Sequence, residues 1–170
     1  VRGFPKRSAG EDFYVLNKLR KLGEIYKGPL PIILIEERDS TRTPYGTGPA
    51  VRDISQLSDP IEEYLFYHPF VFTYLKELLQ TINQLEREHT QDFKLNFLHC
   101  ESHINTEIFI TAIEHIGLID ALNKIKKNCR TQHQFSHQIF LWLDGLKTLQ
   151  FIHCLEKNPV LSRINIKKLN

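Results

Sequence analysis

Methionine, long apolar runs and paired cysteines are all missing from this sequence. None of its 170 residues is methionine, and the chain begins at Val1, so we expect it to be part of a longer protein. No apolar run approaches the ~20 residues that a membrane-spanning helix needs. No apolar stretch follows the first basic residues, as it would in a signal peptide. These absences argue against both a membrane-spanning protein and a secreted one.

Cysteine is scarce and scattered. Cys100, Cys129 and Cys154 are odd in number and include no Cys-x-x-Cys pair. A small secreted domain held together by disulfides would have an even set at shorter spacings. We therefore interpret the three cysteines as reduced, small apolar residues, and we expect a cytoplasmic protein.

The chain also lacks a large excess of charge of either sign. The chain has 22 basic and 20 acidic residues, for a formal net charge of +2. This balance gives no reason to expect nucleic acid or an anionic membrane as a partner. Apolar residues make up 41% of the chain, which is ordinary for a globular protein with a core.

A helix followed by a strand is predicted at the start of the chain. Ser8 and Glu11 have the spacing of a capping box, in which each side chain satisfies a free backbone N–H. Apolar residues then recur about once per turn until Gly23, which is suited to end a helix in the left-handed conformation. The apolar run 32–35, Ile-Ile-Leu-Ile, predicts a short strand buried on both faces.

Helices are predicted over most of the remaining chain. After a turn at 45–49, Asp59 and Pro60 indicate an N-cap followed by a proline in the first turn. The residues from Val71 to Leu85 show one apolar face, and further helices are expected over 106–116, 118–127 and about 134–156. The expected fold class is α+β and predominantly α, with residues 1–50 ending one domain, 51–58 a polar linker, and 59–170 a helical domain.

The acidic pair Glu11-Asp12 is the best candidate for chemistry. It lies at the predicted helix start, where free N–H groups and the helix dipole stabilise an anion. Such a carboxylate can act as a general base when a substrate hydroxyl is within hydrogen-bond reach. Acidic residues are common at helix starts, however, so the pair by itself is better explained as a cap, Glu11, and a solvated first-turn acid, Asp12.

Three stretches carry a wider resemblance. They read GFPKRSAGEDFYVLNKL (residues 3–19), RDSTRTPYGTG (38–48) and WLDGLKTLQFIH (142–153). Together they resemble the C-terminal part of bacterial inverting glycosyltransferases with the GT-A fold, the large family 2 in particular. The first two cover about the first 50 residues, and the helical remainder would be an appended domain.

This resemblance implies that Asp12 deprotonates an acceptor hydroxyl, with Glu11 as a neighbour that contacts the acceptor. Arg7, Arg38 and Arg42 would bind the diphosphate or an anionic acceptor, since guanidinium groups suit phosphate. The sequence contains no Asp-x-Asp and no Gly-x-Gly-x-x-Gly motif. The nucleotide-sugar site and its Mg or Mn ion are therefore expected in a missing N-terminal half, and this fragment is expected to be inactive and without a cofactor when alone.

Other interpretations remain open. The helical part could be a protein-interaction or regulatory module with no catalytic activity. His99 with His103, and His133 with His137, each place two imidazoles four residues apart, as zinc ligands can be, but no third ligand is indicated. An aromatic cluster spans residues 64–74 and is expected to be partly core and partly a surface that docks the missing half.

Overall fold

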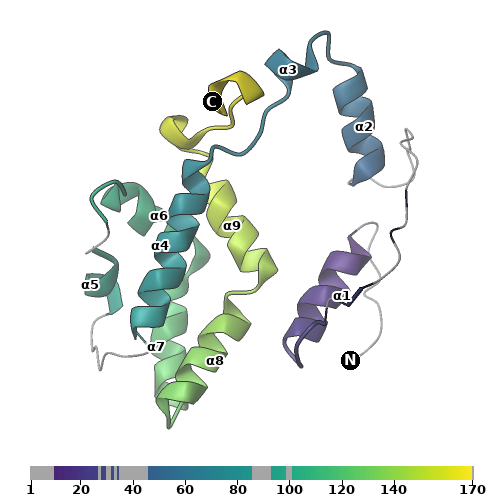
Figure 1. Cartoon of the computed structure of the whole chain (residues 1–170). Helices are drawn as coiled ribbons and strands as arrows, with labels where there is room; N and C mark the ends of the chain where they lie inside the picture. Colours follow the sequence, from purple (N-terminus) through teal and green to yellow (C-terminus); the bar gives the residue numbers. More distant parts are fainter. Residues whose placement is uncertain are drawn as a thin grey trace. The chain divides into compact units, whose positions relative to one another are not determined.

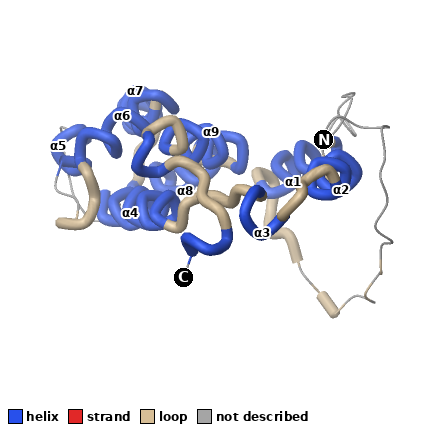
Figure 2. Tube along the Cα trace, turned by 90° about the horizontal axis from the view of Figure 1, so that it is seen from above, coloured by secondary structure: helices blue, strands red, loops and turns tan. Residues whose placement is uncertain are grey.

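The computed structural model describes residues 10–26, 28, 29, 32, 34, 46–85, 93–98 and 101–169. The chain divides into two compact units, residues 1–64 and residues 65–170. Described residues are predominantly helical, as expected, and the β-structure among them is one isolated bridge between Phe66 and Ile164. Figure 2 shows this helical content along the chain.

The unit 65–170 is a bundle of helices around one core (Figure 1). Helices α6 and α9 pack against each other, α9 also packs on α4, and α7 packs on α8. Figures 1 and 2 show α4 on one side of the bundle and α6 and α7 on the opposite side. The helices are α4 (Phe70–Leu85), α5 (Phe93–Leu98), α6 (Thr106–Ile116), α7 (Leu118–Asn128), α8 (Gln132–Trp142) and α9 (Gly145–Leu155).

The core of this unit forms where the apolar faces of the helices meet. In α4 the predicted stripe is confirmed, since Val71 and Leu78 are fully buried. The ring of Phe109 on α6 lies at the centre, with edge contacts to the rings of Phe97 on α5 and Phe151 on α9. All three phenylalanines are fully buried, so aromatic packing joins α9 to the neighbouring helices α5 and α6.

Two short breaks determine how the chain turns between helices. Gly117 has φ = +73°, a conformation that L side chains rarely adopt, and it ends α6 and begins α7. The predicted single helix over 134–156 is wrong: it is interrupted after Trp142. The Asp144 carboxylate accepts hydrogen bonds from the backbone N–H groups of Leu146 and Lys147, at 3.1 Å each, and so starts α9 as a separate helix.

The two ends of the unit are tied back to the bundle. Phe66 and Ile164 exchange two backbone hydrogen bonds, of 2.8 and 3.0 Å. The last residues then form two short 3₁₀-helices, η1 (Pro159–Leu161) and η2 (Ile166–Leu169). Leu161 is buried in the core, so the C-terminal segment is packed against the helices.

The unit 1–64 has a different character. Its helices are α1 (Glu11–Arg20), α2 (Thr47–Ser55) and α3 (Pro60–Glu63). The Asp59 cap before Pro60 is confirmed, because its carboxylate accepts from Ile61 N and Glu62 N. None of the described residues in this unit is buried, and Leu16, Leu22 and Ile25 are among its exposed apolar side chains. The described part of this unit therefore has no core of its own.

Several local predictions in this unit are wrong. Helix α1 is capped by Gly10 rather than Ser8, and its cap makes no side-chain hydrogen bond. Gly23 does not adopt a positive φ, and α1 ends three residues before it. The expected turn at 45–49 and linker at 51–58 overlap α2, because Pro49 fits a first helical turn and the apolar residues Ala50, Val51 and Ile54 are spaced along one helical face.

The predicted buried strand at 32–35 is not observed at its described positions. Ile32 and Leu34 are 88% and 90% exposed, and neither is in a strand. Ile33 and Ile35 lie outside the described residues. A strand buried on both faces needs neighbouring strands and a covering layer, and the described residues of this unit provide neither.

Candidate functional site

The proposed catalytic pair lies in the first turn of α1, as predicted. Glu11 and Asp12 are both exposed, and they are the acidic residues of that turn. One oxygen of the Asp12 carboxylate, Oδ1, accepts a hydrogen bond of 2.8 Å from the backbone N–H of Phe13. Since a carboxylate has several acceptor positions, Asp12 can still accept a hydrogen bond from another donor, such as a substrate hydroxyl.

The basic residues expected around Asp12 are not among the described residues. Arg7, Arg38 and Arg42 all lie outside them, so whether they face the carboxylate stays a prediction. The described pockets are all lined by residues of the 65–170 unit, and none includes Glu11 or Asp12. What the structure supports here is an accessible carboxylate at a helix start.

The histidines that the structure describes do not come together as a metal site. His133 and His137 are exposed on α8, and His103 lies 3.3 Å from the carboxylate of Glu101. His99 is outside the described residues. Among the described residues, no group of three His, Cys, Asp or Glu side chains could hold a metal ion. These residues therefore offer no place for the divalent ion that the glycosyltransferase resemblance implies.

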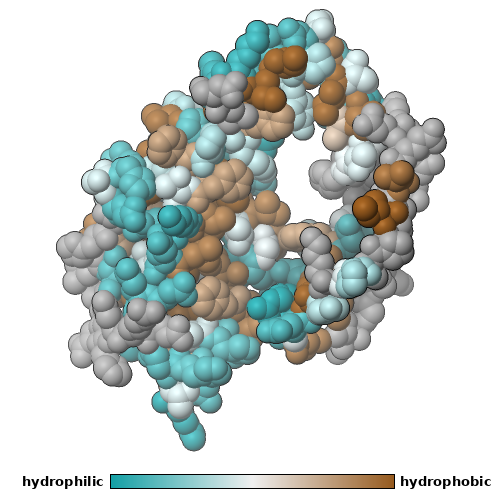
Figure 3. Space-filling view, viewed as in Figure 1, coloured by the Kyte–Doolittle hydropathy of each residue, from teal (hydrophilic) through white to brown (hydrophobic). Residues whose placement is uncertain are grey.

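The aromatic cluster at 64–74 divides between core and surface. Tyr74 is buried and its hydroxyl accepts a hydrogen bond of 3.0 Å from Asn105 N, while Phe66, Phe70 and Phe72 are 40%, 48% and 51% exposed. Figure 3 shows apolar side chains gathered on the face over α4, α8 and α9. This unit therefore leaves an apolar area uncovered, as the sequence partly predicted.

A cluster that the sequence analysis missed surrounds Tyr67. Its hydroxyl lies 3.2 Å from His153 Nε2, and the two rings stack at 6.3 Å. The guanidinium of Arg163 covers the same tyrosine ring at 4.5 Å and pairs with the carboxylate of Glu156. The four residues come from three separate segments of the chain, so no local spacing could have indicated this cluster.

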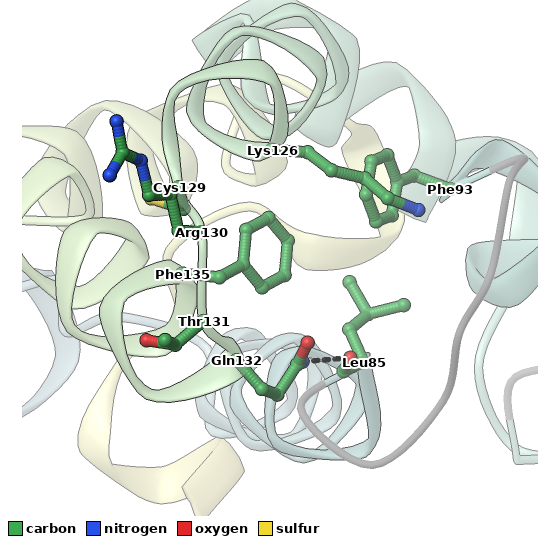
Figure 4. Close-up of a pocket in the computed structure, with 8 residues that line it drawn as sticks. All are labelled: Leu85, Phe93, Lys126, Cys129, Arg130, Thr131, Gln132 and Phe135. Atoms are coloured by element: carbon green, nitrogen blue, oxygen red, sulfur yellow. Dashed lines mark hydrogen bonds between the residues drawn. The ribbon is translucent and has the colours of Figure 1, made fainter.

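A pocket of about 290 Å³ opens at the end of the α7–α8 pair (Figure 4). The rings of Phe93 and Phe135 stack there with centroids 5.8 Å apart, and Lys126 Nζ lies 5.0 Å from the Phe93 centroid. Figure 4 shows Gln132 turned toward Leu85, where its Nε2 donates a 2.9 Å hydrogen bond to the backbone carbonyl. The pocket is small for a ligand site.

A second pocket, of about 530 Å³, lies between the start of α6 and the end of α9, and Cys154 and Lys157 are among its lining residues. Burial raises the pKa of the Cys154 thiol, and the positive charge of Lys157 lowers it by a smaller amount. A thiol in this environment stays protonated near neutral pH and is a weak nucleophile. This pocket therefore does not have the character of a thiol-based active site.

Among the described residues, the helices lack the combination of length and apolar character needed to cross a membrane. Comparison of this chain with protein-family models, curated protein sequences and solved structures gives no match.

Proposed function

We propose that this chain is the acceptor-side end of an inverting glycosyltransferase, in which Asp12 is the general base. The observation that carries the proposal is the exposed Asp12 carboxylate in the first turn of α1, within the stretch that resembles the glycosyltransferase motif. An accessible carboxylate is what this role needs, because the base must reach a hydroxyl on a bound acceptor. A buried or fully hydrogen-bonded Asp12 would have argued against it.

The chemistry proposed for this residue is a single displacement. The acceptor oxygen forms a bond to the anomeric carbon of a nucleotide sugar while the bond from that carbon to the diphosphate oxygen breaks. Asp12 takes the proton that the acceptor hydroxyl loses, and the nucleoside diphosphate leaves with the bonding electron pair. Glu11, next to it and exposed, would contact the acceptor, and Arg7, Arg38 and Arg42 would interact with phosphate or with an anionic acceptor.

The donor site would belong to other parts of a longer protein. The described residues include no cluster of His, Cys, Asp or Glu that could hold a metal ion, so these residues would not bind the metal of the proposed enzyme. In the proposed enzyme, the missing N-terminal half of the same chain would bind the nucleotide sugar and a Mg or Mn ion. The acceptor hydroxyl would then meet the donor at the start of α1.

The test is an Asp12→Asn substitution in the complete natural protein. Release of nucleoside diphosphate should be measured over a panel of nucleotide sugars and acceptors, with donor affinity measured separately. We expect turnover to fall by about 10²- to 10⁴-fold, the usual contribution of a positioned general base, with donor affinity nearly unchanged. Asp53→Asn is the matched control, because Asp53 is also an exposed aspartate and lies on α2. Equal turnover in the two variants would rule out Asp12 as the base.

A second function is favoured by a different observation. Every residue of the buried core lies between Val71 and Leu161, inside the 65–170 unit. A unit with its own core can fold and bind a partner by itself, so we also propose that this part is a helical interaction module. Residues 65–170 should then unfold as one cooperative transition in urea when expressed alone. A broad, non-cooperative transition would contradict the second proposal and leave the first one unaffected.

A further inference from the structure

The hairpin made by α7, its turn and α8 carries charge of one sign. Between Asp120 and Asp144 the sequence has no acidic residue, whereas it has Lys124, Lys126, Lys127 and Arg130 together with two histidines. All four basic side chains and both histidines are exposed. Since the whole chain has a formal net charge of only +2, positive charge is concentrated at this end of the bundle.

Helix stability explains only part of this pattern. Lys126 and Lys127 lie in the last turn of α7, where the helix dipole favours cations. Arg130 lies beyond the end of that helix, and Lys124 and Lys127 place like charges three residues apart, which destabilises a helix. In the part of the chain that the structure describes, neither Lys124 nor Arg130 forms an ion pair. The surplus charge is therefore available to a partner.

A pocket lies beside these charges, in the seam between α7 and α8. Its volume is about 380 Å³, and it is lined by Lys124, Ile125, Asn128, Cys129, Gln134 and Gln138. Ile125 and Cys129 are half-buried and pack against the core, whereas the other four side chains are exposed. The site thus has an apolar floor and a rim of amide and ammonium groups. Figure 3 shows the surface at this end of the α7–α8 hairpin to be hydrophilic.

We propose that this surface binds an acidic segment of a partner protein. The segment would carry several Asp or Glu residues around one apolar side chain. The apolar side chain would occupy the pocket, and the carboxylates would pair with Lys124, Lys127 and Arg130. Helix α7 has 11 residues, and its length of about 16 Å spans roughly five residues of extended peptide. The inference goes beyond glycosyl transfer and uses none of the residues proposed for it.

The lining favours a peptide over a nucleic acid. Proteins that bind single strands stack bases on exposed aromatic rings, and no aromatic side chain lines this pocket. The nearby Trp142 is half-buried, with Lys147 Nζ 4.9 Å from its ring centroid. Asn128 Nδ2 donates to the carbonyl of Lys124, and Gln134 Oε1 accepts from Arg130 N. The remaining amide positions of these two residues, and those of Gln138, can donate to and accept from a peptide backbone.

The test uses the complete 170-residue chain and a fluorescent peptide. The probe has about twelve residues, Asp and Glu in alternation with one central Leu, and binding is followed by anisotropy at low salt and at ~0.15 M salt. The triple variant Lys124→Gln, Lys127→Gln, Arg130→Gln should weaken binding about tenfold. The control Lys18→Gln, Lys76→Gln, Lys168→Gln removes the same charge from other exposed positions and should change binding less than about twofold.

A change in the probe keeps the test independent of how the variants fold. Replacing the central Leu of the peptide by Ser leaves its charge unchanged and should weaken binding to the unmodified chain by about tenfold, because the pocket would lose an apolar side chain. Three results would overturn the proposal: no saturable binding, equal weakening by the two triple variants, or no effect of the Leu-to-Ser change. Tighter binding of an oligothymidylate of equal charge would also overturn it, in favour of a nucleic-acid surface.

Discussion

The hydroxyl oxygen of Tyr67 lies 3.2 Å from Nε2 of His153 and so joins the segment before α4 to the last turn of α9. The guanidinium of Arg163 lies over the same ring, 4.5 Å from its centroid, and pairs with Glu156. One tyrosine therefore connects the beginning, the last helix and the C-terminal segment of the 65–170 unit.

Two substitutions of Tyr67 should distinguish the contribution of its hydroxyl to stability from that of its ring. Tyr67→Phe keeps the ring under Arg163 and removes the hydroxyl, so we expect a loss of about 0.5–1.5 kcal/mol in the free energy of unfolding. Tyr67→Ala removes both contacts and should lose more. Urea unfolding measures both, with Tyr26→Phe, at a tyrosine that is 87% exposed, as the control. If Tyr67→Phe behaves like Tyr26→Phe, the contact does not stabilise the fold.

The centre of the core should be the most sensitive position. Phe109 is fully buried, and its ring contacts those of Tyr74, Phe97 and Phe151. Phe109→Ala should lower the free energy of unfolding by about 3–5 kcal/mol, since it removes apolar burial and leaves a cavity. Phe140→Ala makes the same change on a ring that is 43% exposed and should lose less than about 1.5 kcal/mol. Similar losses in the two variants would contradict this account of the core.

Lys147 has two expected roles. Its ammonium group should stabilise the end of α6, and its side chain should shield the Trp142 ring from solvent. Its Nζ donates a 2.8 Å hydrogen bond to the carbonyl of Ile116 and lies 4.9 Å from the Trp142 ring centroid. Lys147→Met keeps an apolar stem and should lose about 1.5 kcal/mol, as expected for a hydrogen bond from a charged group.

Fluorescence separates the two roles of Lys147, because Trp142 is the single tryptophan of the chain. Lys147→Ala should shift the emission to longer wavelength by exposing the ring, and Lys147→Met should shift it much less. Lys76→Met, at an exposed lysine of α4, is the control for stability. An unchanged emission in Lys147→Ala would mean that the lysine does not shield the ring.

Alkylation of Cys154 should depend on pH in a defined way. Burial raises the pKa of this thiol above its ordinary value of 9.0, so the native protein holds less thiolate than the unfolded chain at a given pH. Reaction with iodoacetamide at pH ~8 should be slower in the folded protein than in urea, and should accelerate as the pH rises past 9. Mass spectrometry of the peptide that contains Cys154 measures the rate. Equal rates in the folded and unfolded protein at pH ~8 would contradict the shift.

The raised pKa of the Cys154 thiol also makes the stability of the fold depend on pH. Because the unfolded thiol ionises first, the contribution of Cys154 to stability is fully present below pH ~9 and is lost as the pH rises through the folded pKa. Lys157→Gln removes the charge that lowers the pKa and should slow alkylation further. A faster reaction in that variant would show that Lys157 acts through access rather than charge.

Local signals in the sequence predicted the helices well where the helix ends were marked. Helix α6 has the predicted bounds because Asn105 caps its start and Gly117 ends it. The break before Asp144 was missed because apolar residues continue across it. The helical spacing of these apolar residues is the same whether or not an N-cap interrupts the helix. The strand at 32–35 was predicted from a short, β-branched apolar run, whereas a strand also needs partners that a local pattern does not reveal.

The candidate sites differ in the same way. Glu11 and Asp12 could be located from the sequence, because a helix start and its acidic residues are neighbours in the chain. The cluster of Tyr67, His153, Glu156 and Arg163 could not, since only the packing of distant segments brings these side chains together. The charge of the α7–α8 hairpin was present in the sequence, but its pocket depends on how the two helices pack.

The backbone bridge between Phe66 and Ile164 has a consequence for synthesis of the chain. It pairs a segment at the beginning of the 65–170 unit with one close to its end, and closing so long a loop is entropically costly. Helices α4 to α9 can form as they leave the ribosome, but the backbone of Phe66 lacks its hydrogen-bond partner until Ile164 emerges. We expect this unit to complete its fold only after Ile164 has left the ribosome.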